Sequence, residues 1–291
     1  MAWHAYVRLR NKATIAVIVV AIFLIFLWNL TCNEHENASL RPEISNPYMV
    51  KPSTGPDLEL LPNLTALPWP KMNRPNKIAT FTGFDIALTI GSYQTFQALL
   101  LKFQSVMISL NLQDQWFLTA GTLIGSQRHH DVIPWDDDLD VIVNLKYRNL
   151  IRITLKRLAP EFGFHISADL DKLFFSPRPA SDISNPNITG SFKLTSYPWS
   201  WPFLDIFYYK YLNDTHLFEG YSGDHFIKKS DGFPTMYRPL GRNWYPAPRR
   251  PLSFLQVYYE SNQQVCFRSY WSHAYESLRE SESVPCSTLI G

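Results

Sequence analysis

Cysteine is scarce in this chain, whose 291 residues include only Cys32, Cys266 and Cys286. Their spacings match no zinc-binding motif, which excludes the familiar structural zinc modules. In an oxidising compartment Cys266 and Cys286 could close a loop near the C-terminus, and such a bridge would contribute roughly 3 kcal/mol. Cys32 would then be left over, either unpaired, lipidated or linking two chains in a homo-oligomer.

The sequence also lacks a strong excess of charge and an internal repeat. Its net charge is +2, and no long basic stretch interleaves with aromatic residues. We therefore expect no nucleic-acid partner. Aromatic residues make up 15% of the chain and include nine tryptophans. This content suits either a well-packed core or a carbohydrate-facing cleft and does not choose between them.

Charged residues are missing from 13–30, which consists mostly of Ile, Val, Leu, Phe and Ala. A helix over this stretch spans about 27 Å and just covers a thin, early-secretory bilayer. Basic residues precede it and acidic residues follow it, so the positive-inside rule leaves 1–12 in the cytosol. A cleaved signal peptide is the alternative, but no clear small-x-small cleavage site follows. We therefore expect a single-pass type II protein of the Golgi or endoplasmic reticulum membrane, with everything after residue 30 in the lumen.

Prolines punctuate the next segment, 31–80, which contains eight of them and shows no sustained periodicity. Since proline fixes φ and removes a hydrogen-bond donor, this segment is predicted to be an extended luminal stem, followed by a folded domain at 81–291. Asn-x-Ser/Thr sequons agree weakly with a luminal position. They begin at Asn29, Asn37, Asn63, Asn187 and Asn213.

Hydrophobic spacing in the folded part predicts both helices and strands. Ser92 can cap a helix that runs to about Leu110, and Gly121 and Gly125 indicate a tight turn and a short helix. Pro251 suits the start of a last helix. The remaining expected elements are helices at 150–158 and 252–259 and strands at 116–118, 139–143, 172–175, 191–194 and 203–209. This order indicates an α+β (mixed α/β) domain, a mixed sheet flanked by helices.

A run of carboxylates at the start of a predicted strand carries the clearest chemical signal. Alternate side chains of a strand share a face, so Asp138 and Asp140 point the same way. Asp136 joins them if the strand begins early, whereas Asp137 would point away. Two carboxylates about 5 Å apart repel by roughly 3–4 kcal/mol at an effective dielectric constant near 20. A cation would relieve this repulsion, and oxygen ligands at a half-open site favour Mg²⁺ or Mn²⁺ over zinc.

Asp205 is a carboxylate inside an apolar run, which is costly unless the group is paired or bound to metal. If its strand lies beside 139–143, Asp205 completes a metal site of three carboxylates with Asp138 and Asp140. There it would serve as a metal ligand, as the general base for an acceptor hydroxyl, or as both.

The turn at Gly125 and Ser126 is predicted to form the other half of the site. Glycine lets the backbone approach a phosphate closely, and a helix N-terminus supplies oriented N–H groups. Arg128 follows within one turn and could reach a phosphate oxygen. Metal, amides and Arg128 would together stabilise the charge that phosphoryl transfer spreads over its oxygens.

Each of these features has a structural interpretation when it is taken alone. An Asp-rich run is usually a solvated turn, Gly-Ser is usually a loop, and Asp205 could be a hydrogen-bonded core acid. Their combination between apolar strands favours a catalytic site. For several other residues the sequence does not decide between a contact with the substrate and a purely structural role. They are His129, His130, Lys193, Trp199, Trp201, Arg242, Arg249 and Arg250.

The sequence around the acidic run resembles the LicD/fukutin family. Residues 120–129 read AGTLIGSQRH and residues 133–141 read IPWDDDLDV. The family pattern is Gly-Thr-Leu-apolar-Gly, then Arg-His, then Ile-Pro-Trp-Asp-x-Asp-apolar-Asp. Residues 203–207 resemble a later Asp-Ile-Phe block of that family. The chain departs from the pattern at Gln127 and at 130–131, where larger residues replace small ones.

The resemblance covers about residues 92–275 and is dense over 118–143. It implies a nucleotidyltransferase-type fold and the transfer of a substituted phosphate, of the alditol phosphate or phosphocholine type. The implied donor is linked to cytidine diphosphate, and the implied acceptor is a hydroxyl of a glycan or glycoprotein. Carried over by position, Asp136, Asp138 and Asp140 form the acidic motif, with the latter two as metal ligands.

Two other functions stay open from the sequence. A glycosyltransferase could use the Asp-x-Asp pair to bind a metal and a nucleotide sugar, and type II topology suits that class as well. An inactive member that binds glycan or holds a partner enzyme is the other alternative. The crowded carboxylates argue against it, because a binding module gains nothing from their repulsion.

Overall fold

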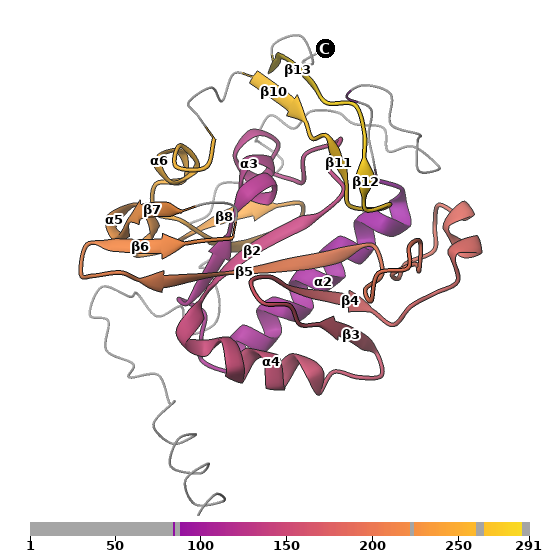
Figure 1. Cartoon of the computed structure of the whole chain (residues 1–291), viewed down its shortest axis with the longest axis horizontal. Coiled ribbons are helices and arrows are strands. Elements are labelled where there is room, and N and C mark those ends of the chain that lie inside the picture. Colours follow the sequence, from indigo (N-terminus) through magenta and orange to yellow (C-terminus); the bar gives the residue numbers. More distant parts are fainter. Residues whose placement is uncertain (1–83, 85–87, 222–223, 260–264, 287–291) are drawn as a thin grey trace, which may run out of the picture. The chain divides into compact units, whose positions relative to one another are not determined.

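The computed structural model describes, within the unit Pro47–Gly291, residues 84, 88–221, 224–259 and 265–286 (Figure 1). The predicted tail, membrane segment and stem, which together occupy 1–80, lie outside the described residues and stay predictions. Among the helices that the structure describes, none combines the length and the apolar character needed to cross a bilayer.

A mixed sheet lies at the centre of the described part, which confirms the expected mixed sheet flanked by helices. Its strands are β1 (Trp116–Leu118), β2 (Leu139–Asn144), β3 (Phe162–His165), β4 (Asp171–Phe175), β5 (Phe203–Tyr211), β6 (His216–Glu219) and β7 (His225–Lys228). They follow the order β1-β2-β5-β4-β3, and β6 pairs with both β5 and β7. β2 and β5 are parallel, and the other pairs are antiparallel.

The register of β2 and β5 decides which side chains meet. It sets Asp140 beside Asp205 and Ile142 beside Phe207. Because side chains alternate along a strand and neighbours in register share a face, these four residues lie on one side of the sheet. The intervening residues are fully buried in the core: Leu139, Val141, Leu204 and Ile206.

Three longer helices pack around this sheet. α2 (Ile90–Ser109) contacts β4 and β5, α3 (Ala120–Arg128) contacts β2, and α4 (Arg148–Lys156) contacts α2 and β3. The N-cap of α2 is Thr89 and not Ser92 as predicted, because Thr89 Oγ1 accepts a hydrogen bond from Ser92 N at 3.1 Å. The capping residue therefore lies three positions earlier than expected.

Smaller elements complete the described fold. They are η2 (Leu145–Tyr147), η3 (Ala180–Ser184), α5 (Lys229–Gly232), β8 (Met236–Leu240), β9 (Asn243–Ala247), α6 (Pro251–Leu255), β10 (Val265–Arg268), β11 (Trp271–Ser272), β12 (Ser277–Leu278) and β13 (Glu282–Pro285). β8 pairs with β9, β10 with β13 and β11 with β12. α6 begins at Pro251 as predicted but is shorter than the expected helix.

The predicted strand at 191–194 does not form. Phe192 makes only isolated bridges, one with Arg178 and one with Trp201. The backbone of this segment thus forms hydrogen bonds with two separate stretches of chain and does not extend a β-ladder. Its composition nevertheless suits a strand. The predicted strands at 116–118, 139–143, 172–175 and 203–209 are confirmed.

The C-terminal segment, which we define as residues 265–286, lies over α3 in Figure 1, where it is coloured yellow. A disulfide joins Cys266 to Cys286, at a Cα–Cα distance of 4.9 Å. The pairing that the sequence left open is therefore present. Arg128 Nη2 in α3 donates a hydrogen bond to Val265 O at 3.1 Å and ties the segment to the helix.

Candidate active and metal-binding site

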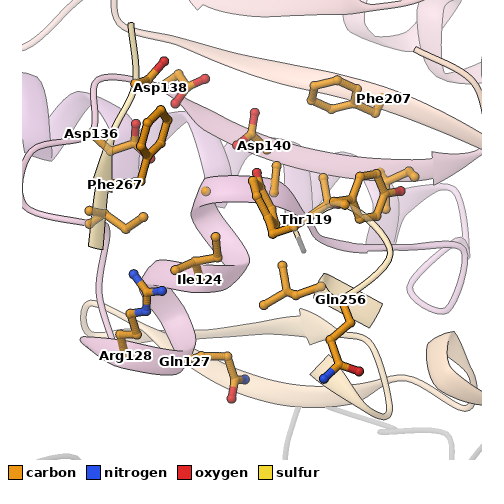
Figure 2. A pocket seen from close by; sticks show the side chains of 18 of the residues that line it. Thr119, Ile124, Gln127, Arg128, Asp136, Asp138, Asp140, Phe207, Gln256 and Phe267 are labelled. Carbon is orange, nitrogen blue, oxygen red and sulfur yellow. The ribbon is translucent and has the colours of Figure 1, made fainter. Parts of the chain in front are cut away.

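A pocket of about 810 Å³ opens along α3, between the sheet, α6 and the C-terminal segment. Figure 2 shows Asp136 and Asp138 close together at one end of it, with Asp140 nearby, and Arg128 and Gln127 at the far end of α3. All five of these side chains line the pocket. The acidic run and the helix thus share one cavity, as the sequence predicted in outline.

Three side chains at the acidic end could hold a divalent metal. Asp138, Asp205 and His273 each bring one ligand atom to within 4.8 Å of the others. Asp138 directly precedes β2, Asp205 lies in β5 and His273 directly follows β11. Asp138 Oδ2 and His273 Nε2 are 3.1 Å apart. Carboxylate oxygens and an imidazole nitrogen are ordinary ligands of divalent ions, so these residues fit such a group.

Asp140 is not a member of this group, although it was predicted to bind metal with Asp138 and Asp205. His273 is the third member of the group, and the metal contact of Asp140 stays a prediction. Nothing in the local sequence marks His273, because it lies far from the acidic motif and outside any ligand-like spacing. Only the folding of the C-terminal segment against β2 and β5 reveals it.

Asp136 and Asp140 flank the first turn of α3. A Cβ placed on Gly121 would lie 2.5 Å from Asp136 Oδ2 and 3.7 Å from Asp140 Oδ2. Asp140 is further held by its backbone N–H, which donates to Thr122 Oγ1 at 2.7 Å. Because Gly121 has no side chain, the carboxylates of Asp136 and Asp140 can approach the helix closely.

Burial and crowding raise the pKa values of the acidic groups. Burial raises the pKa of Asp136 well above its usual value, and repulsion from Asp138 raises it further. The same two causes, in the same order, act on Asp140. Burial raises the pKa of Asp205 despite Lys172, whose Nζ donates to Asp205 Oδ1 at 2.7 Å. Ionising all of these groups at once is thus unfavourable without a cation.

Asp137 is fully buried and, unlike Asp136, Asp138 and Asp140, does not line the pocket. Its carboxylate accepts hydrogen bonds from Ser272 Oγ at 3.0 Å, Ala274 N at 3.2 Å and Arg279 Nη2 at 3.4 Å. Two of these donors flank His273 in sequence. Asp137 therefore anchors the turn that presents the imidazole to Asp138.

The pKa of His273 reflects the same surroundings. Burial lowers it, but the nearby carboxylates, Asp138 foremost, outweigh burial and leave the pKa above its usual value. The carboxylates therefore favour the protonated form of the imidazole, whose Nε2 lies 3.1 Å from Asp138 Oδ2.

Gly125 and Ser126 lie in the last turn of α3 and not at its N-terminus, so the predicted phosphate-binding turn is misplaced. Ser126 is fully buried, and its Oγ donates to Pro239 O at 2.8 Å. A Cβ on Gly125 would come within 2.5 Å of Asp131 O, so this glycine allows a loop to pack closely. Of the two glycines of α3, Gly121 in the first turn lines the pocket and Gly125 does not.

Arg128 lines the pocket, as a phosphate contact would have to. Its guanidinium also holds the C-terminal segment, since Nη1 lies 3.7 Å from Cys266 Sγ in addition to the bond to Val265. Burial lowers its pKa. A structural role is thus shown for Arg128, and its contact with phosphate stays a prediction.

The residues left open by the sequence lie outside the pocket lining in the described part of the chain. Trp201 packs in the core, where its Nε1 donates to Asp137 O at 2.6 Å and its ring meets Phe96. The His129 ring lies edge-on to Trp135, and burial lowers the pKa of His129 to about 4. Trp201 and His129 therefore contribute to the packing of the domain.

Comparison with known proteins supports the resemblance noted above. Residues 113–250 match a family model described as LicD/FKTN/FKRP, nucleotidyltransferase domain. The matched region includes β1 to β9, the acidic run and Asp205, but not His273. No curated protein matches the chain. Residues 113–250 therefore form a transferase-type domain of the LicD/fukutin family.

Proposed function

We propose that the protein transfers a substituted phosphate, of the alditol phosphate or phosphocholine type, from a cytidine-diphosphate donor to a hydroxyl of a glycan or glycoprotein. The register of β2 and β5 carries this proposal, because it sets Asp205 beside Asp140, which lines the pocket together with Asp138. Such crowding of buried carboxylates is unfavourable in itself. A site that binds a cation together with a diphosphate explains this crowding, because the cation offsets the repulsion between the carboxylates.

Asp138, Asp205 and His273 would hold the ion, Mg²⁺ or Mn²⁺. When bound, it would neutralise charge on the donor's diphosphate and favour attack at phosphorus. Asp205 suits a ligand better than a base, because Lys172 already donates to its Oδ1. Of the two roles that the sequence left to Asp205, we therefore favour the first.

The first turn of α3 would bind the donor's diphosphate. Thr119, Ala120 and Gly121 line the pocket, and the side chain of Thr119, the N-cap residue, makes no capping hydrogen bond. The first N–H groups of a helix have no partner within the helix, so they can donate to phosphate oxygens. Arg128, farther along the pocket wall, would add positive charge to the same cavity.

The acceptor hydroxyl would attack the phosphorus distal to cytidine. A bond forms between the hydroxyl oxygen and this phosphorus, the bond to the bridging oxygen breaks, and cytidine monophosphate leaves. The hydroxyl proton passes to a carboxylate. Asp136 and Asp140 suit this role, because they line the pocket outside the metal group and burial raises their pKa values towards those of effective bases.

We place the reaction in the lumen of the Golgi or endoplasmic reticulum, with residues 13–30 as the membrane anchor. The disulfide between Cys266 and Cys286 supports an oxidising compartment, where such bonds persist. The glycan or glycoprotein acceptor would be met on the same side of the membrane.

A donor screen tests the proposed reaction. Full-length protein is assayed with cytidine- and uridine-diphosphate donors as wild type, Asp138→Asn and Asp140→Asn, with the exposed Asp169→Asn as the matched control. We expect turnover with cytidine donors alone, and a loss of about 1,000-fold or more in the two site variants but not in the control. Equal turnover in all four proteins, or a requirement for a uridine-diphosphate sugar, would contradict the proposal.

A further inference from the structure

The C-terminal segment lies outside the matched family domain, which ends at residue 250, yet it forms one wall of the pocket. It contributes Val265, Phe267, Ser269 and His273 to the lining. Through His273, the segment also contributes a member of the metal group, together with Asp138 and Asp205. The acidic site is therefore completed by a part of the chain that the family model does not include.

We propose that His273 is a direct metal ligand and that its nitrogen makes the site prefer a transition ion such as Mn²⁺ over Mg²⁺. The inference rests on the proposed function in that it names the ion of the same site. Mg²⁺ strongly prefers oxygen ligands and gains little from imidazole. Transition ions accept imidazole readily, so one nitrogen among oxygens shifts the preference towards them.

The distances in the group suit coordination. Two ligands at right angles around one ion, each about 2.1 Å from it, lie about 3 Å apart. Asp138 Oδ2 and His273 Nε2 lie 3.1 Å apart, and the Asp205 oxygen is within 4.8 Å of both. The three side chains come from separate elements, so their convergence is not a by-product of one acidic stretch.

The surroundings of His273 hold its ring in place. The residues on both sides of it, Ser272 and Ala274, donate to the buried carboxylate of Asp137. The ring meets Phe203 edge-on, with the centroids 6.2 Å apart. A ligand fixed in this way loses little freedom when an ion binds, which is the arrangement that metal sites require.

A simple ion pair between His273 and Asp138 is the competing explanation, and it predicts the opposite effect. A protonated imidazole competes with a metal for Asp138, so its removal would leave metal affinity unchanged or raise it. A ligand contributes to the affinity, so its removal would lower it. The sign of the change in affinity therefore separates the two explanations.

Calorimetric titration of the full-length protein, with any purification tag removed, measures this sign for Mn²⁺ and for Mg²⁺. His273→Gln is compared with wild type and with His216→Gln, which removes a β6 histidine that does not line the pocket. We expect His273→Gln to lower the Mn²⁺ affinity by about 10-fold or more, and the Mg²⁺ affinity by less than about 3-fold. Equal losses for both ions, or an unchanged or stronger affinity for Mn²⁺, would overturn the inference.

Pulsed electron paramagnetic resonance of bound Mn²⁺ gives a second readout, and the wild-type spectrum tests the ligand even where the variant does not fold. An imidazole nitrogen bound to Mn²⁺ produces a ¹⁴N coupling, which wild type should show and His273→Gln should lack. Wild-type protein that binds Mn²⁺ without this coupling would overturn the inference. Coupling in a protein that uses no cytidine-diphosphate donor would refute the proposed function and leave the ligand assignment in place.

Discussion

The acidic run at 136–140 contains four carboxylates that face three different environments. Asp137 is buried beneath the C-terminal segment, Asp138 meets His273, and Asp136 and Asp140 face the first turn of α3. Residues of one type thus differ in role within a single turn of chain. Their substitutions should differ accordingly: Asp137 affects stability, whereas the others affect the site.

The glycines of α3 allow the same distinction to be tested. Gly121→Ala improves helix propensity by about 1 kcal/mol, but its Cβ would meet the movable Asp136 Oδ2 at 2.5 Å. In Gly125→Ala the Cβ would instead meet backbone, Asp131 O at 2.5 Å and Ile133 N at 2.8 Å. We expect the first variant to keep its thermal midpoint and lose donor turnover about 10-fold or more. The second should lose about 2 kcal/mol or more of unfolding free energy.

Thermal unfolding, chemical denaturation and single-turnover assays of the two variants measure these effects. The assignment of the first turn of α3 to the donor would be wrong if Gly121→Ala kept full turnover, or if Gly125→Ala were the stable but inactive variant.

The raised pKa values of Asp136, Asp140 and Asp205 predict how pH affects metal binding. Between the unfolded pKa, about 3.9, and the raised folded values, the metal-free folded protein binds more protons than the unfolded chain. Its unfolding free energy therefore falls as pH rises through that window. A cation needs the ionised carboxylates and competes with protons.

The increase in thermal midpoint on adding Mn²⁺ should consequently be larger near pH 7.5 than near pH 5.5. Thermal unfolding with and without the ion measures it, with Asp138→Asn as the variant that should show little increase at either pH. An increase that stays constant with pH would contradict the crowding inferred for these carboxylates.

At the scale of elements, the C-terminal segment stabilises the domain and shapes the pocket together. Its disulfide closes a loop with a sequence separation of 20, and Asp137 anchors its middle. His273 lies between Ser272 and Ala274, the two residues that Asp137 anchors, inside the loop that the disulfide closes. A substitution that destabilises the C-terminal segment should therefore weaken metal binding, even though the substituted residue does not contact the metal group.

The double variant Cys266→Ser, Cys286→Ser tests this coupling. Loss of a loop closure of this length lowers the free energy of unfolding by about 3 kcal/mol, and we expect weaker Mn²⁺ binding as well. Cys32→Ser is the matched control, because it removes a cysteine and keeps the disulfide. Urea denaturation and Mn²⁺ titration measure the two effects, and a double variant that behaves like the control would show that the anchor at Asp137 suffices.

At the scale of the molecule, the structure and the membrane topology can be checked against each other. Asn187 and Asn213 begin sequons within the described part, and both side chains are exposed. A luminal domain would present both to the glycosylation machinery, whereas a cytosolic domain would present neither.

We therefore expect protein made in eukaryotic cells to shift in mobility after glycosidase treatment, and Asn187→Gln and Asn213→Gln each to remove part of that shift. Electrophoresis before and after treatment measures it. Glycosylation at neither position would contradict the proposed luminal location, although it would leave the metal site unaffected.

The sequence by itself determined the helices and strands that show a regular hydrophobic pattern. It also determined the identity of most carboxylates at the site. Helical spacing predicted α2, and short apolar runs predicted β1, β2 and β5, because burial of one face depends on neighbouring residues. The same runs showed that Asp205 lies within a buried strand. The family motif contributed the acidic residues and the reaction class.

Only the tertiary structure decided how distant parts of the chain meet. It added His273 to the metal group, buried Asp137 beneath the C-terminal segment and moved the pocket-facing glycine from Gly125 to Gly121. The physical reason is that these outcomes depend on register and packing between segments far apart in sequence. Local hydrophobic patterns determine which face of an element is buried, but not which partner it is buried against.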